Sequence, residues 1–177
     1  MLLLLAIVLA VALVPLLHGD LRALAALCFR FGWLLALALA IQVLVISVFP
    51  GPPSTLRLTV YLASYAIAVI FLLLNRSIPG LWLVGGGALL NLLAIGANSG
   101  VMPATRGALA TAGVSSSGEA FANSAYVEGA RLWFLGDILA IPASWPLANV
   151  FSVGDLLIAV GCAWTILATT RRRPAGS

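Results

Sequence analysis

Long apolar runs are the feature that most constrains how this chain can fold. They cover about residues 1–17, 24–49, 57–74, 81–97 and 154–170. Runs of about 18 or more apolar residues are typical of helices that cross a bilayer, because a spanning segment must satisfy its backbone hydrogen bonds internally. The chain is 63% hydrophobic and 8% charged, whereas soluble domains carry about 25% charged residues. We therefore expect one all-α domain over residues 1–177, a polytopic membrane helical bundle with about five transmembrane helices.

Arginines predict an orientation for this bundle. All nine basic residues are arginines, and three of them directly follow the last apolar run. If this cluster is cytoplasmic, six arginines lie on the cytoplasmic side: Arg22, Arg30, Arg76, Arg171, Arg172 and Arg173. Three then lie outside: Arg57, Arg106 and Arg131. Cytoplasmic loops are enriched in basic residues, so the bias predicts an external N-terminus and a cytoplasmic C-terminus. It also favours a topology anchor over a nucleic-acid site.

The stretch 98–153 is the long segment outside the apolar runs, and this orientation puts it on the outer face. Residues 104–125 are rich in Ala, Gly, Ser and Thr, which predicts a mobile loop or lid. Residues 131–153 are aromatic and apolar but contain two prolines, so they are too broken to span. We expect this part to lie in the membrane interface, where Trp133 and Trp145 are favoured.

Two of the five acidic residues, Asp137 and Asp155, bracket most of that interfacial segment. Carboxylates at this depth are costly to ionise, so they tend to be neutralised, paired or functional. Two that converge have separated pKa values, one carboxylate staying ionised as a base for water and the other holding a proton as an acid. Aspartic peptidases use this arrangement. Asp137 and Asp155 are therefore the candidate catalytic residues.

Structural roles compete with the catalytic one for both aspartates. Ser152 and Asp155 have the spacing of a capping box at the start of the last helix, where an acid is also stabilised by the helix dipole. Asp137 could face water at the interface, paired with Arg131. Both alternatives stay open on the sequence alone.

The candidate binding residues are Asn91, Asn98, Asn149 and Arg131. If Asn91 or Asn98 faces the aspartates, its amide could orient water or a substrate carbonyl group. The competing interpretation of Asn98 is a helix C-cap together with Gly100. Cys28 and Cys162 lie in apolar runs as small core residues, so we expect no metal site and no organic cofactor.

The run from Asp137 to Gly161 resembles the C-terminal motif region of signal peptidase II, the bacterial lipoprotein signal peptidase. In that family a catalytic aspartate near the outer face precedes a phenylalanine-asparagine-x-alanine-aspartate motif that opens the last helix. Phe151 and Asp155 match its ends, while Ser152 and Gly154 replace the asparagine and the alanine. The run from Gly85 to Asn91 is similar to that family's glycine-rich helix, although no Asp-Arg pair follows Asn91. The resemblance implies an aspartyl peptidase that acts on lipoproteins.

More of the chain resembles a family of uncharacterised bacterial multi-pass membrane proteins, a domain of unknown function. The matching runs are Asn98 to Pro103, Leu132 to Asp137, and Ala148 to Asp155. This resemblance implies a bacterial cytoplasmic (inner) membrane location and no particular activity.

Two functional hypotheses follow. The first is a membrane aspartyl hydrolase related to signal peptidase II, which cleaves a lipoprotein or lipid-linked substrate at the outer edge of the bilayer. The second is a non-catalytic membrane protein that binds a lipid or small molecule or scaffolds a partner. A transporter is disfavoured, because five spans fit poorly with paired inverted repeats.

Overall fold

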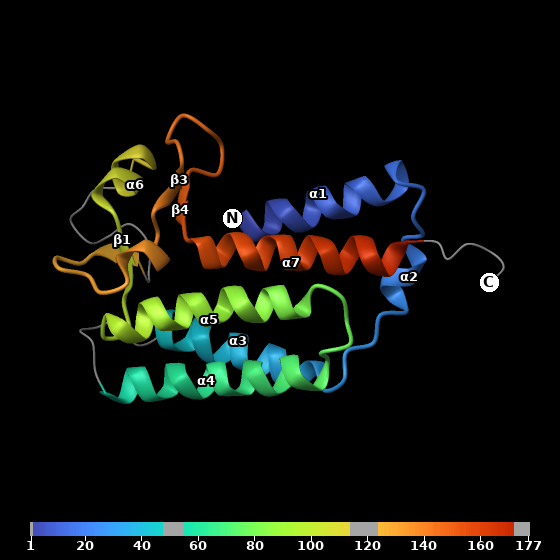
Figure 1. The fold of residues 1–177 in the computed structure, drawn as a ribbon, viewed down its shortest axis with the longest axis horizontal. Coiled ribbons are helices and arrows are strands. Elements are labelled where there is room, and N and C mark those ends of the chain that lie inside the picture. Colours follow the sequence, from blue (N-terminus) through green and yellow to red (C-terminus); the bar gives the residue numbers. More distant parts are fainter. Residues whose placement is uncertain (1, 48–54, 114–123, 172–177) are drawn as a thin grey trace.

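The computed structural model describes residues 2–47, 55–113 and 124–171. The elements of this part of the chain are mostly helical. Five longer helices run side by side, and successive ones alternate in direction (Figure 1). They are α1 (Leu2–Leu16), α3 (Gly32–Ser47), α4 (Thr55–Leu74), α5 (Leu81–Ala97) and α7 (Val153–Thr170). The main contacts join α5 to α7, α1 to α7, and α3 to α4.

Four of the predicted apolar runs coincide closely with these helices, but the run at 24–49 does not form one continuous helix. The start of this run belongs to a short helix, α2 (Arg22–Ala25), and α3 begins only at Gly32. At this break, the backbone N–H and C=O of Arg30 form hydrogen bonds with a side chain instead of with helical backbone groups. The buried Asn75 amide accepts a hydrogen bond from Arg30 N at 2.8 Å and donates one to Arg30 O at 2.9 Å.

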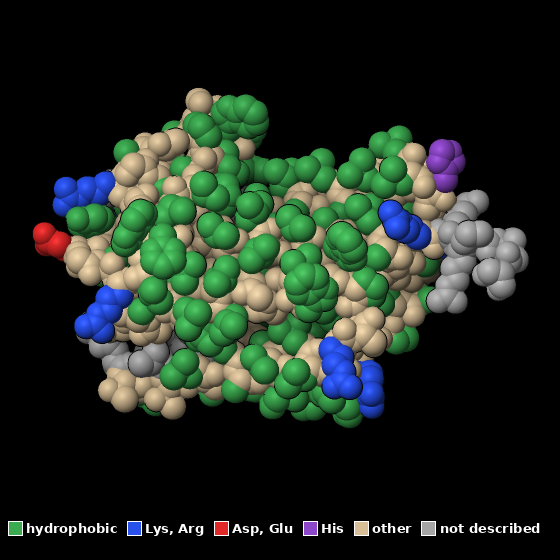
Figure 2. Space-filling model, viewed as in Figure 1, with side chains coloured by type: hydrophobic (Ala, Val, Ile, Leu, Met, Phe, Trp, Pro, Cys, Tyr) green, Lys and Arg blue, Asp and Glu red, His purple; other side chains and the backbone are tan. Residues whose placement is uncertain are grey.

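The surface of the bundle is apolar between two charged ends. Figure 2 shows hydrophobic side chains over the long flank of the molecule and arginines near both ends. At the end where α4 and α7 finish lie Arg22, Arg30, Arg76 and Arg171. At the opposite end lie Arg57, in the first turn of α4, Arg106 and Arg131. In the described part of the chain, α7 is the one helix both long and apolar enough to cross a membrane, and four shorter apolar helical stretches accompany it.

The segment between α5 and α7 contains short strands that the all-α prediction did not include. Strand β1 (Met102–Ala104) pairs in parallel with β2 (Ser124–Tyr126), and β3 (Leu139–Ile141) pairs antiparallel with β4 (Asn149–Phe151). Each strand is three residues long, too short to produce an alternating pattern that could be recognised in the sequence. The predicted interfacial segment 131–153 is thus a 3-10 helix (Trp133–Leu135) followed by a small hairpin.

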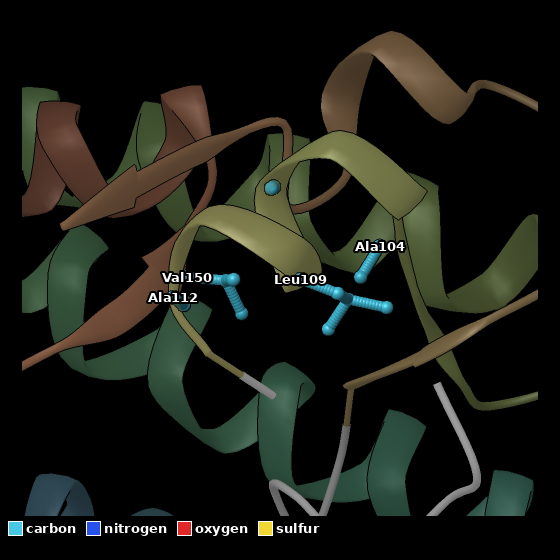
Figure 3. Packing of buried hydrophobic residues seen from close by; sticks show 5 residues of the cluster. Ala104, Leu109, Ala112 and Val150 are labelled. Carbon is cyan, nitrogen blue, oxygen red and sulfur yellow. The ribbon is translucent and has the colours of Figure 1, made fainter. Parts of the chain in front are cut away.

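A second small core holds this end of the molecule together. Helix α6 (Arg106–Thr111) begins at Thr105, whose side chain accepts a hydrogen bond from Ala108 N. Figure 3 shows Leu109 and Ala112 meeting Ala104 from β1 and Val150 from β4. The predicted lid, residues 104–125, therefore includes a helix and most of strand β2. Its middle, residues 114–123, lies outside the described residues.

Candidate functional site

The tight packing of α5 against α7 positions one half of the site. Gly80 and Gly87 lie two helical turns apart, as do Gly154 and Gly161 on α7. A Cβ atom on Gly87 would collide with the carbonyl oxygen of Gly154, and one on Gly161 would come 2.9 Å from the carbonyl oxygen of Gly80. Small residues let helix backbones approach closely. We call these four residues the glycine seam.

The seam brings Asn91 on α5 against the first turn of α7. There Ser152 caps the helix: its hydroxyl accepts a hydrogen bond from Asp155 N at 2.9 Å, while the Asp155 carboxylate accepts one from Ser152 N at 3.0 Å. Asn91 donates to the second carboxylate oxygen of Asp155 at 2.7 Å and accepts from the Ser152 hydroxyl at 2.8 Å. The predicted capping box is confirmed, and Asn91 extends it into a three-residue network.

Asp137 is held by backbone pairing on the strand side of the site. Its N–H donates to Pro103 O at 2.8 Å, and its carbonyl oxygen accepts from Thr105 N at 3.1 Å. Gly136 permits this approach, because a Cβ atom there would collide with the carbonyl oxygen of Pro103. Strand β2 lies along the same β1 strand and supplies Ser124, whose hydroxyl donates to the Asp137 carboxylate at 2.6 Å.

Both aspartates line one cleft of about 370 Å³. Asn91 and Asn149 lie in its wall with Gln42, Tyr65 and Ser124, and the apolar part includes Ile95, Met102, Val150 and Ile158. No arginine is among the described residues of this lining. Asp137 is 4% exposed and Asp155 is half-buried. The two carboxyl groups are not hydrogen-bonded to each other in the described structure, and each accepts hydrogen bonds from other side chains.

The environment of Asp137 changes its acidity. Burial raises the pKa of this carboxyl group from its usual value of 3.8 to about 6. The hydrogen bond from Ser124 opposes that shift, and the negative charge of Asp155 adds to it. Asp155, in contrast, accepts hydrogen bonds at both carboxylate oxygens. The cleft therefore offers two carboxyl groups in different electrostatic settings.

Two of the predicted binding residues, Asn98 and Arg131, lie outside this cleft lining. The Asn98 amide donates to Ala94 O and to Arg131 O, both at 2.7 Å, and its oxygen accepts from Arg131 N at 3.0 Å. The Asn98 side chain thus connects the end of α5 to the loop before the 3-10 helix through hydrogen bonds. The Arg131 side chain is exposed, and among the described residues it has no ion pair with Asp137. Asn98 has the C-terminal role that was its alternative interpretation.

Sequence reasoning missed Ser124, Gln42 and Tyr65. Ser124 is far from any motif, and only the parallel pairing of β1 with β2 brings it to Asp137. Gln42 carried one available signal, since it is a lone amide within a long apolar run. It donates to the buried Ser64 hydroxyl at 3.3 Å. Within the residues described, no group of three or more His, Cys, Asp or Glu side chains could hold a metal ion.

Comparison with known proteins identifies a family whose function is unknown. The model of a family of unknown function, DUF5317, matches residues 26–167. An uncharacterised protein of Thermotoga maritima is 31% identical over 98 residues, which cover 55% of this chain and 56% of that relative. The chain thus spans about half the length of the relative it matches. No solved structure matches.

Proposed function

Because this chain belongs to the DUF5317 family, whose function is unknown, we propose its role from the site itself. The protein is a multi-pass protein of a bacterial cytoplasmic membrane, and its carboxylate cleft hydrolyses a peptide or lipid-linked substrate at the outer edge of the bilayer. The observation that carries this proposal is the convergence of Asp137 and Asp155, in unlike environments, on one cleft.

The membrane part of the proposal is supported by the surface and by the helix directions. Apolar patches above a few hundred Å² are unusual on proteins in water, and here hydrophobic side chains dominate a whole flank (Figure 2). Five helices that alternate in direction would put the two ends of α7 on opposite sides of a bilayer (Figure 1). Four of the described arginines lie at the end where α7 finishes, and three, Arg57, Arg106 and Arg131, lie at the cleft end. This bias favours a cytoplasmic C-terminus and an external cleft.

The chemistry assigns one role to each carboxyl group. Asp155 takes a proton from a water molecule, whose oxygen then bonds to the substrate carbonyl carbon. Protonated Asp137 gives its proton to the carbonyl oxygen, which produces a neutral tetrahedral intermediate. Asp155 then returns its proton to the leaving nitrogen as the C–N bond breaks, and Asp137 recovers a proton as the carbonyl reforms. A base and an acid with different environments are what this sequence of steps requires.

Resemblance supports the substrate class. Phe151 and Ser152 directly precede the last helix, and Asp155 lies in its first turn. This run is similar to the motif region of signal peptidase II, which cleaves lipoproteins. A cleft at the end of an apolar bundle suits a substrate whose lipid part stays in the bilayer. The Asn91 and Asn149 amides in the cleft wall are suited to hold substrate carbonyl groups.

A non-catalytic role is the second candidate, and one observation favours it. Asp155 closes a capping box, and its two carboxylate oxygens already accept hydrogen bonds from Ser152 and Asn91. A carboxylate whose oxygens both accept hydrogen bonds in this way can have a purely structural role, the stabilisation of the helix N-terminus. In that case the cleft binds a small polar molecule or a lipid headgroup without changing it.

Isosteric substitution separates the two candidates. The purified protein would be reconstituted in phospholipid vesicles with a lipid-modified lipoprotein precursor, and cleavage would be followed by gel shift and mass spectrometry. We expect Asp137→Asn and Asp155→Asn each to reduce the rate at least 100-fold, as is typical when general acid–base catalysis is lost. Asp20→Asn is the matched control, because Asp20 is exposed at the opposite end of the bundle. Cleavage that persists in both cleft variants would overturn the enzymatic proposal.

A further inference from the structure

A second cavity borders the strand pair β1–β2, which also borders the carboxylate cleft. It has a volume of about 470 Å³, and its lining includes Ala104, Arg106, Tyr126, Gly129 and Trp133. Met102 and Ser124 line the carboxylate cleft, while Ala104 and Tyr126 of the same strands line this cavity. Strands β1 and β2 therefore border both cavities. We call this second cavity the arginine pocket.

Arg106 is the charged residue among the described residues of this lining. Its guanidinium carbon lies 4.3 Å from the centre of the Tyr126 ring, a cation–π contact that holds the group in place without neutralising it. Arg106 has no ion pair with any other described residue, and its side chain is exposed. Glu128 lies between two residues of the lining in sequence, but it is exposed and is not part of the lining. Within the described residues, the pocket thus presents one positive charge that no acidic side chain pairs with.

The rest of the described lining is mainly apolar and aromatic. Trp133 is 58% exposed and forms a T-shaped contact with Phe134, which is 51% exposed. The Thr105 hydroxyl in the lining already accepts a hydrogen bond from Ala108 N, in the first turn of the helix it caps. A ligand that fits this chemistry carries an anionic group beside an apolar body.

The position of the pocket identifies the source of such a ligand. It lies at the end of the bundle that holds the carboxylate cleft, where the apolar flank of the helices ends (Figures 1 and 2). Tryptophan and tyrosine are favoured at the headgroup level of a bilayer, and arginine binds phosphate with a planar set of donors. We propose that the arginine pocket binds the phosphate headgroup of an anionic phospholipid, with the glycerol and upper acyl chain against Trp133. This inference goes beyond hydrolysis and rests on the membrane part of the proposed function.

Fluorescence quenching by brominated lipids tests the pocket. The full-length protein would be placed in phosphatidylcholine vesicles that contain a minor fraction of phosphatidylglycerol, with bromine on the acyl chains of one lipid at a time. The Trp133 contribution is the difference between wild type and Trp133→Phe. We expect brominated phosphatidylglycerol to be enriched roughly fivefold over its bulk fraction at Trp133, which is the effect of about one arginine near an anionic lipid.

Variants of nearby arginines distinguish the pocket from general attraction to the surface. Arg106→Gln should remove the enrichment, whereas Arg131→Gln should keep it, because Arg131 is exposed at the same end but lies outside the lining. Enrichment that survives in Arg106→Gln, or that is lost equally in both variants, would overturn the proposal. Loss of the phosphatidylglycerol signal on addition of inorganic phosphate would also overturn it, because the pocket would then select a free anion.

The same experiment reports separately on the bilayer. Trp82 and Trp164 lie on α5 and α7 with 72% and 58% of their surface exposed, so brominated phosphatidylcholine should quench them in every variant. Absence of that quenching would contradict the membrane proposal. Its presence without phosphatidylglycerol enrichment at Trp133 would contradict only the lipid pocket. Cleavage activity is not needed for either readout.

Discussion

The Asp137 carboxyl group makes the stability of this protein depend on pH. Its pKa is raised to about 6, mainly because the group is buried, and in the unfolded chain it returns to about 3.8. Between these values the folded state binds more protons than the unfolded state. Stability therefore falls as the pH rises through this window, and the cost of burying the ionised group is fully present above pH 6.

Unfolding at two pH values tests this effect. In a detergent-solubilised preparation, the free energy of unfolding of the wild type should fall by about 2 kcal/mol from pH 4 to pH 7, relative to Asp137→Asn. The asparagine retains an oxygen that can accept from Ser124 but carries no charge. Asp20→Asn, at an exposed site, should follow the wild type. Parallel pH profiles for wild type and Asp137→Asn would show that burial does not perturb this group.

At the same scale, sequence reasoning found the two aspartates but not their surroundings. The chain has only five acidic residues, and this made Asp137 and Asp155 candidates for the site. The spacing of Ser152 and Asp155 predicted the capping box. Asn91 was a candidate through its glycine-rich helix. Ser124 had no signal, because its contact with Asp137 depends on the pairing of two three-residue strands.

At the scale of the elements, the α5–α7 pair determines the geometry of the cleft. The glycine seam sets how closely the two helices approach, and this distance allows Asn91 to reach both Ser152 and Asp155. A Cβ atom at Gly154 would collide with the Asn91 side chain itself. The packing of the helices and the polar network are therefore one structural unit.

Alanine substitutions on α5 test this unit. Gly87→Ala must push α7 away, since the added Cβ meets the backbone of Gly154, and we expect it to cost about 2 kcal/mol of stability. Gly86→Ala is the matched control, because a Cβ there has no neighbour within 4 Å. It should stabilise the helix by roughly 0.5–1 kcal/mol. Urea or SDS unfolding curves measure both, and equal effects at the two positions would contradict the role of the seam.

The apolar runs predicted most of the helices because a long uninterrupted apolar segment can satisfy its own backbone hydrogen bonds as a helix. The run at 81–97 is helix α5 over Leu81–Ala97. The break before Gly32 was missed, since it depends on Asn75, which lies far along the chain and binds the Arg30 backbone. The small strands were missed for a similar reason. Their pairing is a tertiary contact and leaves no pattern within three residues.

At the scale of the whole molecule, the proposed bilayer must be thin around some helices. Helix α5, which has described residues on both sides, is 17 residues long. At 1.5 Å per residue this is about 26 Å, less than the hydrocarbon thickness of about 30 Å. Local thinning accommodates such helices at modest cost. A thinned bilayer would also bring headgroups toward the carboxylate cleft, where a lipid-linked substrate has to enter.

Every proposal for the cleft depends on its position at the outer face of a protein that crosses the bilayer. Labelling of single cysteines with a membrane-impermeant maleimide in sealed spheroplasts tests that position directly. One variant keeps Cys28, which is exposed and not the core residue that its apolar run predicted, and carries Cys162→Ala. It reports on the arginine-rich end. The other lacks both native cysteines and carries Glu128→Cys at an exposed site near the cleft end.

We predict that position 128 is labelled in sealed spheroplasts and that Cys28 is labelled only after the membrane is permeabilised. Immediate labelling of Cys28, or protection of position 128 until permeabilisation, would contradict the proposed orientation of the cleft.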